Sequence, residues 1–163
     1  MIDNNYMRCT IGQWLPDKGK LAVFPGSTVP HLSYIGKAQK KGGRGANMLL
    51  LGKYSYNKGG HRLGKKGGHR AFRQAEFFPV WRSADDLDYD LDDILDNDGP
   101  LGNNGFVWDN LHCASNSNLE SAWFGSAGCQ VVAGGPGHPS SGETGPWKSF
   151  VDHAYTKSGK EQL

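Results

Sequence analysis

The hydrophobic residues of this chain fall in short runs separated by turn-forming residues. Short apolar or alternating runs bounded by Gly, Pro, Asn and Asp are typical of β-strands. No long segment repeats its apolar residues at the helical period of 3.6, so we expect few helices. Residues 70–76 are the best candidate for a short helix, and 147–155 fits either a helix or a strand. The pattern predicts strands over 20–25, 48–56, 77–82, 106–112 and 130–133.

Length and glycine content add to this pattern. The chain has 163 residues, which is about the length of one domain, and 24 of them are glycine. Such a sequence is rich in turns and irregular backbone. No internal repeat or linker divides it. We therefore predict a single domain over 1–163 that is mainly β, with long loops and one or two short helices.

The ends and the cysteines suggest a location. The first residues lack the basic start and apolar core of a secretory signal, and no apolar run approaches the roughly 20 residues of a membrane helix. We expect a monomer that is made in the cytoplasm, has no membrane span, and reaches a cell wall only if a partner delivers it. Cys9, Cys113 and Cys129 are odd in number and widely spaced, so at least one thiol is expected to be free.

Charge is segregated along the chain although the net charge is only +2. Eleven Lys or Arg residues and no acid lie between Gly36 and Ala75, and eight aspartates lie between Asp85 and Asp98. The plain interpretation of the basic tract is a solvated pair of loops. The alternative is a cationic face for nucleic acid or another anionic polymer.

The aspartate run raises the question of calcium. Asp88, Asp90 and Asp92 alternate like the first ligands of an EF-hand loop, but Asp93 replaces the glycine of the sixth position and no glutamate follows at the twelfth. An acidic loop paired with the basic tract is the simpler interpretation, and a calcium site of another kind stays open. We predict no metal or other cofactor for the chemistry of the chain.

One short segment carries candidate catalytic residues. Cys129 follows the small turn Ser126-Ala127-Gly128 and precedes an apolar run, so backbone N–H groups of the turn can converge on one point, as an oxyanion hole requires. His112 ends an apolar run upstream. A thiol needs a neighbouring base to act as a nucleophile at neutral pH. The alternative is a buried structural cysteine and an ordinary loop histidine.

The segment 105–132 resembles the catalytic signature of the L,D-transpeptidase catalytic-domain family. In that family a strand ends in His and is followed by a loop, by Ser-His-Gly-Cys and by a second strand. Here Asn110-Leu111-His112 ends the first strand, and Ser126-Ala127-Gly128-Cys129 begins the second. The match is closest to a divergent branch seen in phage and bacterial proteins. Ala127 replaces the family's histidine, and Val131 replaces the usual arginine two residues after the cysteine.

The resemblance implies a β-sandwich fold and an enzyme that acts on L,D amide bonds of peptidoglycan stem peptides. Cys129 would be the nucleophile and His112 its base, oriented by the backbone carbonyl of Cys113. The sulfur should then lie within hydrogen-bonding reach of a His112 ring nitrogen. Hydrolysis, as in a phage lysis enzyme or an injected effector, is preferred over cross-linking. The resemblance further implies an oxyanion hole from the N–H groups of Ala127, Gly128 and Cys129, and substrate contacts from Ser126, Gln130, Trp108 and Trp123.

Other classes remain as alternatives. A papain-like hydrolase or cell-wall amidase would place its histidine after the cysteine, and His153 follows Cys129 by only 24 residues. A zinc peptidase is disfavoured because no H-E-x-x-H motif is present. The alternative without catalysis is a module that binds nucleic acid or another polyanion through the basic tract 36–75.

Overall fold

The computed structural model of the chain describes residues 2–40, 46–82, 94–96, 107–138 and 142–155. These residues form a mainly β structure, which confirms the predicted class. The largest sheet has six strands in the spatial order β1 (Cys9–Leu15), β2 (Lys20–Ser27), β9 (Gln130–Val132), β8 (Leu111–Cys113), β5 (His69–Gln74) and β4 (Tyr56–His61). Adjacent strands of this sheet are antiparallel except β8 and β9, which are parallel.

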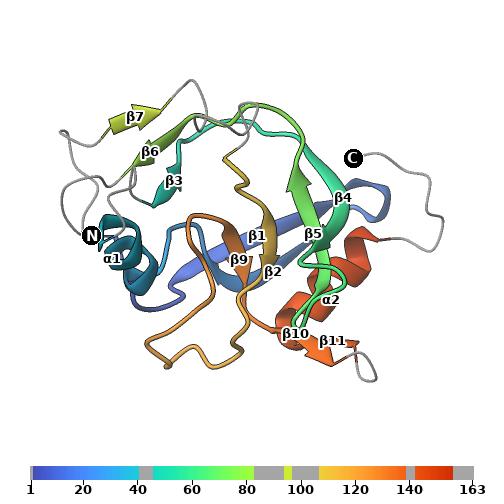
Figure 1. Cartoon of the computed structure of the whole chain (residues 1–163). Coiled ribbons are helices and arrows are strands. Elements are labelled where there is room, and N and C mark those ends of the chain that lie inside the picture. The colour runs from blue at the N-terminus through green and yellow to red at the C-terminus, as the bar shows by residue number, and fades with distance from the viewer. Residues whose placement is uncertain (1, 41–45, 83–93, 97–106, 139–141, 156–163) are drawn as a thin grey trace.

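Two smaller sheets and two helices complete the described structure. The three-stranded sheet contains β3 (Asn47–Leu49), β6 (Val80–Arg82) and β7 (Ile94–Asp96), and lies apart from the six-stranded sheet in Figure 1. The two-stranded sheet pairs β10 (Gly135–His138) with β11 (Gly142–Thr144). The helices are α1 (Leu32–Lys40) and α2 (Gly145–Ala154), and a single 3-10 turn spans Pro16–Lys18. No helix among the described residues is long and apolar enough to cross a membrane.

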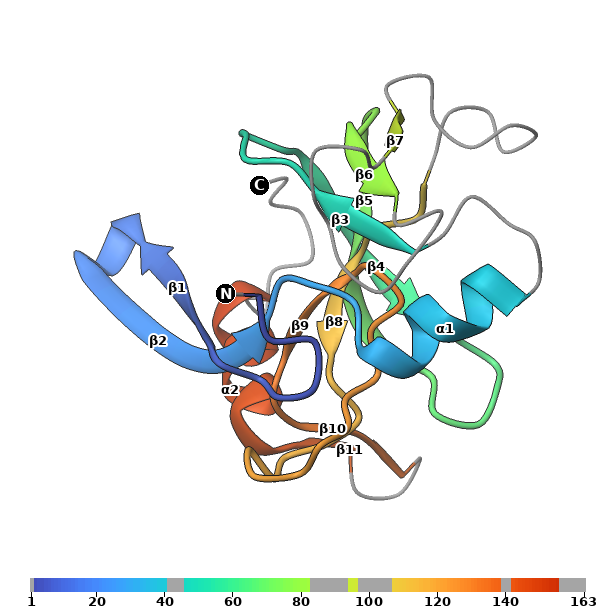
Figure 2. The same cartoon turned by 90° about the vertical axis from the view of Figure 1, so that its left-hand side faces the viewer.

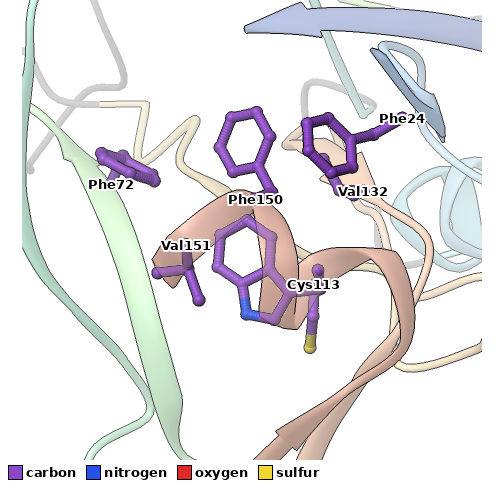
Figure 3. Packing of buried hydrophobic residues seen from close by; sticks show 7 residues of the cluster. Phe24, Phe72, Cys113, Val132, Phe150 and Val151 are labelled. Carbon is purple, nitrogen blue, oxygen red and sulfur yellow. The ribbon is translucent and has the colours of Figure 1, made fainter. Parts of the chain in front are cut away.

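Helix α2 covers one face of the six-stranded sheet. Trp147 is fully buried and stacks on Phe150, with ring centroids 5.6 Å apart. Phe150 in turn meets Phe24 of β2 edge to face at 5.2 Å. Burying aromatic side chains of this size is a major source of folding free energy. Figure 3 shows this core, to which strands β2, β5, β8 and β9 all contribute.

The sheet ends in a hairpin that projects from the rest of the chain (Figure 2). Strands β1 and β2 pair over their whole length, with Trp14 opposite Leu21. Exposure alternates along β1, as expected where one face of a strand packs and the other does not. Trp14 lies on the exposed face. The sequence pattern correctly placed β2 but missed β1, because Cys9–Leu15 mixes polar and apolar residues.

Several predicted elements are wrong in type or extent. The predicted helix over 70–76 is wrong: these residues lie in and just after strand β5, which pairs with β4 and β8. Tertiary pairing outweighs the weak local helix preference of this segment. The predicted strand over 48–56 is interrupted, because β3 ends at Leu49 and β4 begins at Tyr56. Residues 147–155, which fitted either type, are mostly helical.

The parallel pair β8–β9 positions the residues of interest. Leu111 lies opposite Gln130, and His112 lies opposite Val131. Because side chains alternate across a strand, Cys113 points to the face covered by α2, whereas His112 points to the other face. Cys129 comes one residue before β9 and packs with the cluster on that second face. His112 and Cys129 therefore share one face of the sheet.

Candidate functional site

The turn before β9 is held together by the Ser126 hydroxyl. Ser126 Oγ donates to the backbone carbonyl of Cys129 at 2.6 Å and accepts from the Gly128 N–H at 3.2 Å. Gly128 has a φ of +135°, and a Cβ there would lie 2.6 Å from Asn47 Cβ and 2.9 Å from Asp109 Oδ1. Only glycine fits this position. The turn thus presents Cys129 in one fixed backbone geometry.

The Cys129 sulfur is surrounded by backbone from the segment before β8. Sγ donates to the carbonyl of Trp108 at 3.5 Å. The backbone N–H groups of Asn110 and of Cys129 itself favour the thiolate and lower the pKa of the thiol. Burial works in the opposite direction and raises the pKa of the thiol to about 12, with a further contribution from the carboxylate of Asp109. At neutral pH, Cys129 is therefore a thiol that needs a base.

His112 is oriented as such a base requires. Its Nδ1 lies 2.7 Å from the carbonyl oxygen of Cys113, the contact expected from the resemblance. Nδ1 must carry the proton in that contact, so Nε2 has a free lone pair. Burial and, to a lesser extent, the stacked ring of His61 lower the pKa of His112 to about 3. The imidazole is therefore neutral at physiological pH and able to accept a proton.

The expected hydrogen bond between sulfur and imidazole is absent. Among the described residues, none joins Cys129 Sγ to His112, because the sulfur is directed to the Trp108 carbonyl. His112 lies on β8, and Cys129 comes just before the neighbouring strand β9. Neighbouring strands are about 4.8 Å apart, and the two residues are offset by two positions at about 3.3 Å each. Ideal strand geometry therefore places their Cα atoms about 8 Å apart. Both side chains share a face of the sheet, and the ring of His112 stacks on His61 of β4.

A buried carboxylate lies next to the nucleophile turn and was missed by sequence reasoning. Asp109 is 1% exposed; its Oδ1 accepts from Asn47 Nδ2 at 3.1 Å, and no hydrogen-bond partner of Oδ2 is found among the described residues. Arg82 Nη1 donates to Asn47 Oδ1 at 2.5 Å. Burial raises the pKa of Asp109 to about 6, against the opposing effects of Asn47 and Arg82. These three residues come from the segment before β8, from β3 and from β6.

Not all the residues predicted to form the oxyanion hole are free to do so. The Gly128 N–H, assigned to that role, is instead used inside the turn by Ser126. Ala127 is exposed at the turn, and the Cys129 N–H lies at its own sulfur. The N–H of Asn110 also favours the Cys129 thiolate and was missed, since no local motif identifies it. The backbone donors nearest the thiol are therefore those of Asn110 and Cys129.

The predicted substrate contacts fall into two groups. Ser126 is 1% exposed and its hydroxyl is used within the turn, so its visible role is structural. Gln130 accepts from the Tyr56 hydroxyl at 2.7 Å. Trp108 and Trp123 are 45% and 41% exposed, so both can meet a ligand. Trp108 also has a φ of +61°, which is unusual for a bulky residue and occurs most often at functional sites.

A different cysteine contacts a histidine directly. Cys113 Sγ lies 3.4 Å from His69 Nε2. Burial raises the pKa of this thiol to about 11, and Cys113 is fully buried. A substrate cannot reach it. His153 lies on α2, where it contacts Gln13 at 3.2 Å, so the alternative pairing of Cys129 with His153 is wrong.

Some basic side chains of the tract 36–75 have partners within the chain. Arg70 binds Glu143 at 2.9 Å and Asp152 at 2.6 Å, and Lys58 lies over the ring of Tyr155. The side chains of alternate strand residues point to opposite faces, which divides the tract. The aspartates proposed for calcium lie outside the described residues. In the described part of the chain, no group of three His, Cys, Asp or Glu side chains is placed to hold a metal ion.

Comparisons with protein-family models, with curated proteins and with solved structures found no match to this chain. The resemblance to the L,D-transpeptidase catalytic domain therefore depends on sequence motifs, chiefly those of segment 105–132. The site geometry is the independent observation that bears on the chemistry.

Proposed function

We propose that this protein is a cysteine-dependent enzyme that cuts L,D amide bonds in peptidoglycan stem peptides. The observation that carries the proposal is the hydrogen bond from His112 Nδ1 to the Cys113 carbonyl, which leaves Nε2 as a proton acceptor on the face that also holds Cys129. The substrate class comes from the resemblance of segment 105–132, and so does the proposed L,D-transpeptidase-like sandwich fold.

The reaction begins with proton transfer. His112 Nε2 takes the thiol proton as the Cys129 sulfur attacks the amide carbonyl, forming a carbon–sulfur bond and a tetrahedral oxyanion. The N–H groups near the sulfur, those of Asn110 and Cys129, are the donors for this oxyanion. Collapse breaks the carbon–nitrogen bond, and the leaving amine takes the proton from His112. Water then hydrolyses the thioester, which releases the acid and regenerates the thiol.

The pKa values of the pair favour this general-base route. Burial keeps Cys129 as a thiol and His112 neutral, so the resting state is not a thiolate–imidazolium ion pair. The neutral pair carries no net charge into a buried site, and charge develops only during attack. Moving the sulfur from the Trp108 carbonyl to His112 is the step that starts the reaction.

The test is incubation with purified peptidoglycan and mass analysis of the released fragments. We expect the wild type to shorten or release stem peptides and Cys129→Ala to be inactive. Cys9→Ser is the matched control, because Cys9 is a partly exposed thiol on the edge strand β1 and should be dispensable. Cross-linked products in place of shortened stems would identify a transpeptidase.

Two results would contradict the proposal. Activity that survives in Cys129→Ala would exclude this cysteine as the nucleophile. No change in any fragment, together with nucleic-acid binding that weakens steeply with salt, would favour the module that binds through the basic tract.

A further inference from the structure

Arg73 has no acidic or amide partner among the described residues, as is also true of Arg62 in the turn of the β4–β5 hairpin. Arg70 binds Glu143 and Asp152, and Arg82 donates to Asn47. Arg73 is exposed, and no ion pair or hydrogen bond to its guanidinium is found among the described residues. Successive side chains of a strand point to opposite faces, and Phe72 points toward α2. The side chain of Arg73 therefore leaves β5 on the other face, which also holds His112 and Cys129.

The side chain of Arg73 is nevertheless held in place along its length. A Cβ on Gly59 would lie 3.1 Å from Arg73 Cδ and 3.2 Å from Cγ, so the absence of a side chain at Gly59 makes room for the stem. The guanidinium carbon lies 5.1 Å from the centroid of the Trp108 ring. A cation–π contact of this kind fixes the orientation of the guanidinium and leaves its N–H groups available to donate hydrogen bonds. Arg73 is therefore a preorganised cation with free donors.

Both contacts place Arg73 at the candidate catalytic residues. Trp108, under the guanidinium, accepts the hydrogen bond from Cys129 Sγ at 3.5 Å through its carbonyl. The charge of Arg73 also reaches His61, whose ring stacks on His112 at 4.3 Å. A planar guanidinium with free donors binds carboxylates in a bidentate manner. The site beside the thiol is thus suited to an anionic group of the substrate.

We propose that Arg73 and Trp108 form a carboxylate-binding subsite, in which the guanidinium binds the free carboxylate of the terminal residue of a stem peptide. This inference rests on the proposed function. It makes the enzyme a carboxypeptidase: the amide bond next to the bound residue is cut by Cys129, and that residue leaves as a free amino acid, taking its amine proton from His112. The carboxylate itself is unchanged. A cross-linked stem, whose terminal carboxyl is an amide, lacks the recognised group.

The binding test needs no catalysis. Acetyl-D-alanine and its uncharged amide are titrated into the full-length protein, and the indole N–H of Trp108 and the Nε–H of Arg73 are followed by NMR. We expect the acid to shift both signals and the amide to leave them in place. Arg73→Gln should weaken acid binding by about tenfold or more, the usual effect of losing a hydrogen bond to a charged group. Arg73→Lys keeps the charge but not the planar guanidinium, so its affinity for the acid should lie between those of the wild type and Arg73→Gln.

Lys65→Gln is the matched control, because it removes the same charge from the exposed turn of the β4–β5 hairpin without touching Trp108. Equal shifts by acid and amide, no shift by the acid, or equal affinity of Arg73→Gln and wild type would each overturn the subsite. These outcomes do not depend on whether the protein cuts peptidoglycan.

Product analysis separates the two proposals. We expect the wild type to remove terminal residues from free stems and to leave cross-linked stems intact, and Arg73→Gln to lose this preference. Cutting of cross-linked and free stems at the same rate by both proteins would overturn the subsite and keep the proposed function. Acid-specific binding at Arg73 with no change in any peptidoglycan fragment would keep the subsite and refute the proposed function.

Discussion

The imidazole rings of His61 and His112 stack at a centroid distance of 4.3 Å with an angle of 13° between their planes. They come from β4 and β8, which are separated in the sheet by β5. The third ring of the group, His69, lies 5.4 Å from His61 and 5.6 Å from His112. Three imidazoles so close together cannot all be protonated without strong repulsion. This arrangement makes the site sensitive to acid.

Stability should fall as the pH drops below about 6.5. Burial lowers the pKa of His61 to about 4 and that of His112 to about 3, so the unfolded chain binds more protons than the folded chain in that window. Each such histidine lowers the free energy of unfolding by about 1.4 kcal/mol for each unit by which the pH falls in that window. Asp109 acts in the opposite direction below pH 6, because its folded pKa is raised. We expect urea unfolding at a series of pH values to show a net loss, since the histidines outnumber this acid.

The variant His61→Gln tests that assignment. It should reduce the slope of stability against pH between 6 and 4.5 by up to about 1.4 kcal/mol per unit. His31→Gln is the control, because that ring binds Ser33 and the Ala122 carbonyl away from the stacked group. An unchanged slope in His61→Gln would show that the stacked rings do not control acid stability.

Replacing Asp109 should make Cys129 more reactive. The charged or titratable groups that act on the thiol are this carboxylate and the Tyr56 hydroxyl from β4, and Arg82 of β6 is bound to the same network. Removing the negative charge in Asp109→Asn favours the thiolate, so the pH midpoint of iodoacetamide alkylation should fall by about one unit, because burial is the larger cause of the raised thiol pKa. Peptide mass analysis measures this for each cysteine separately.

Cys9 provides an internal control in the alkylation experiment. It is partly exposed and lies on β1, and its own midpoint should not move in Asp109→Asn. A parallel shift of Cys9 would indicate general loosening of the fold. Superimposable Cys129 profiles in wild type and variant would show that the carboxylate does not act on the thiol.

His112 should be indispensable if it is the general base. His112→Gln removes the proton acceptor and should lower the rate of stem-peptide cleavage by about 10²- to 10⁴-fold. His153→Gln is the matched control, since His153 lies on α2 against Gln13 and should leave the rate unchanged. Equal rates for His112→Gln and wild type, measured by product release, would remove His112 from the mechanism.

The core prediction compares two tryptophans. Trp147 is fully buried against Phe150, whereas Trp14 is 60% exposed on the projecting hairpin. Trp147→Ala should lower the free energy of unfolding by about 3–5 kcal/mol, because it leaves a cavity between α2 and the sheet. Trp14→Ala should change it by no more than about 0.5 kcal/mol. Urea denaturation of both variants measures the difference, and similar losses would contradict the packing described.

Local patterns were enough to predict the class of the structure and the two segments that carry the candidate catalytic residues. Alternating and apolar runs indicated the mainly β class, because strand burial repeats every two residues. The turn Ser126-Ala127-Gly128 and the run ending at His112 lie within 17 positions of Cys129, so a short motif contains them. The helix predicted over 70–76 failed because its residues pair with β4, the preceding strand of the same hairpin, and with β8, which is distant in sequence.

Only the tertiary structure determined what surrounds the thiol. The sequence singled out Cys129, His112 and Cys113, and their roles in catalysis remain a prediction. That His112 Nδ1 reaches the Cys113 carbonyl depends on the strand's geometry, and that Asp109 binds Asn47, 62 positions upstream, depends on how β3 packs. Gly59 and Trp108 meet Arg73 for the same reason. The order of the strands in a sheet and their register determine such contacts. The periodicity of a single segment predicts neither the order nor the register.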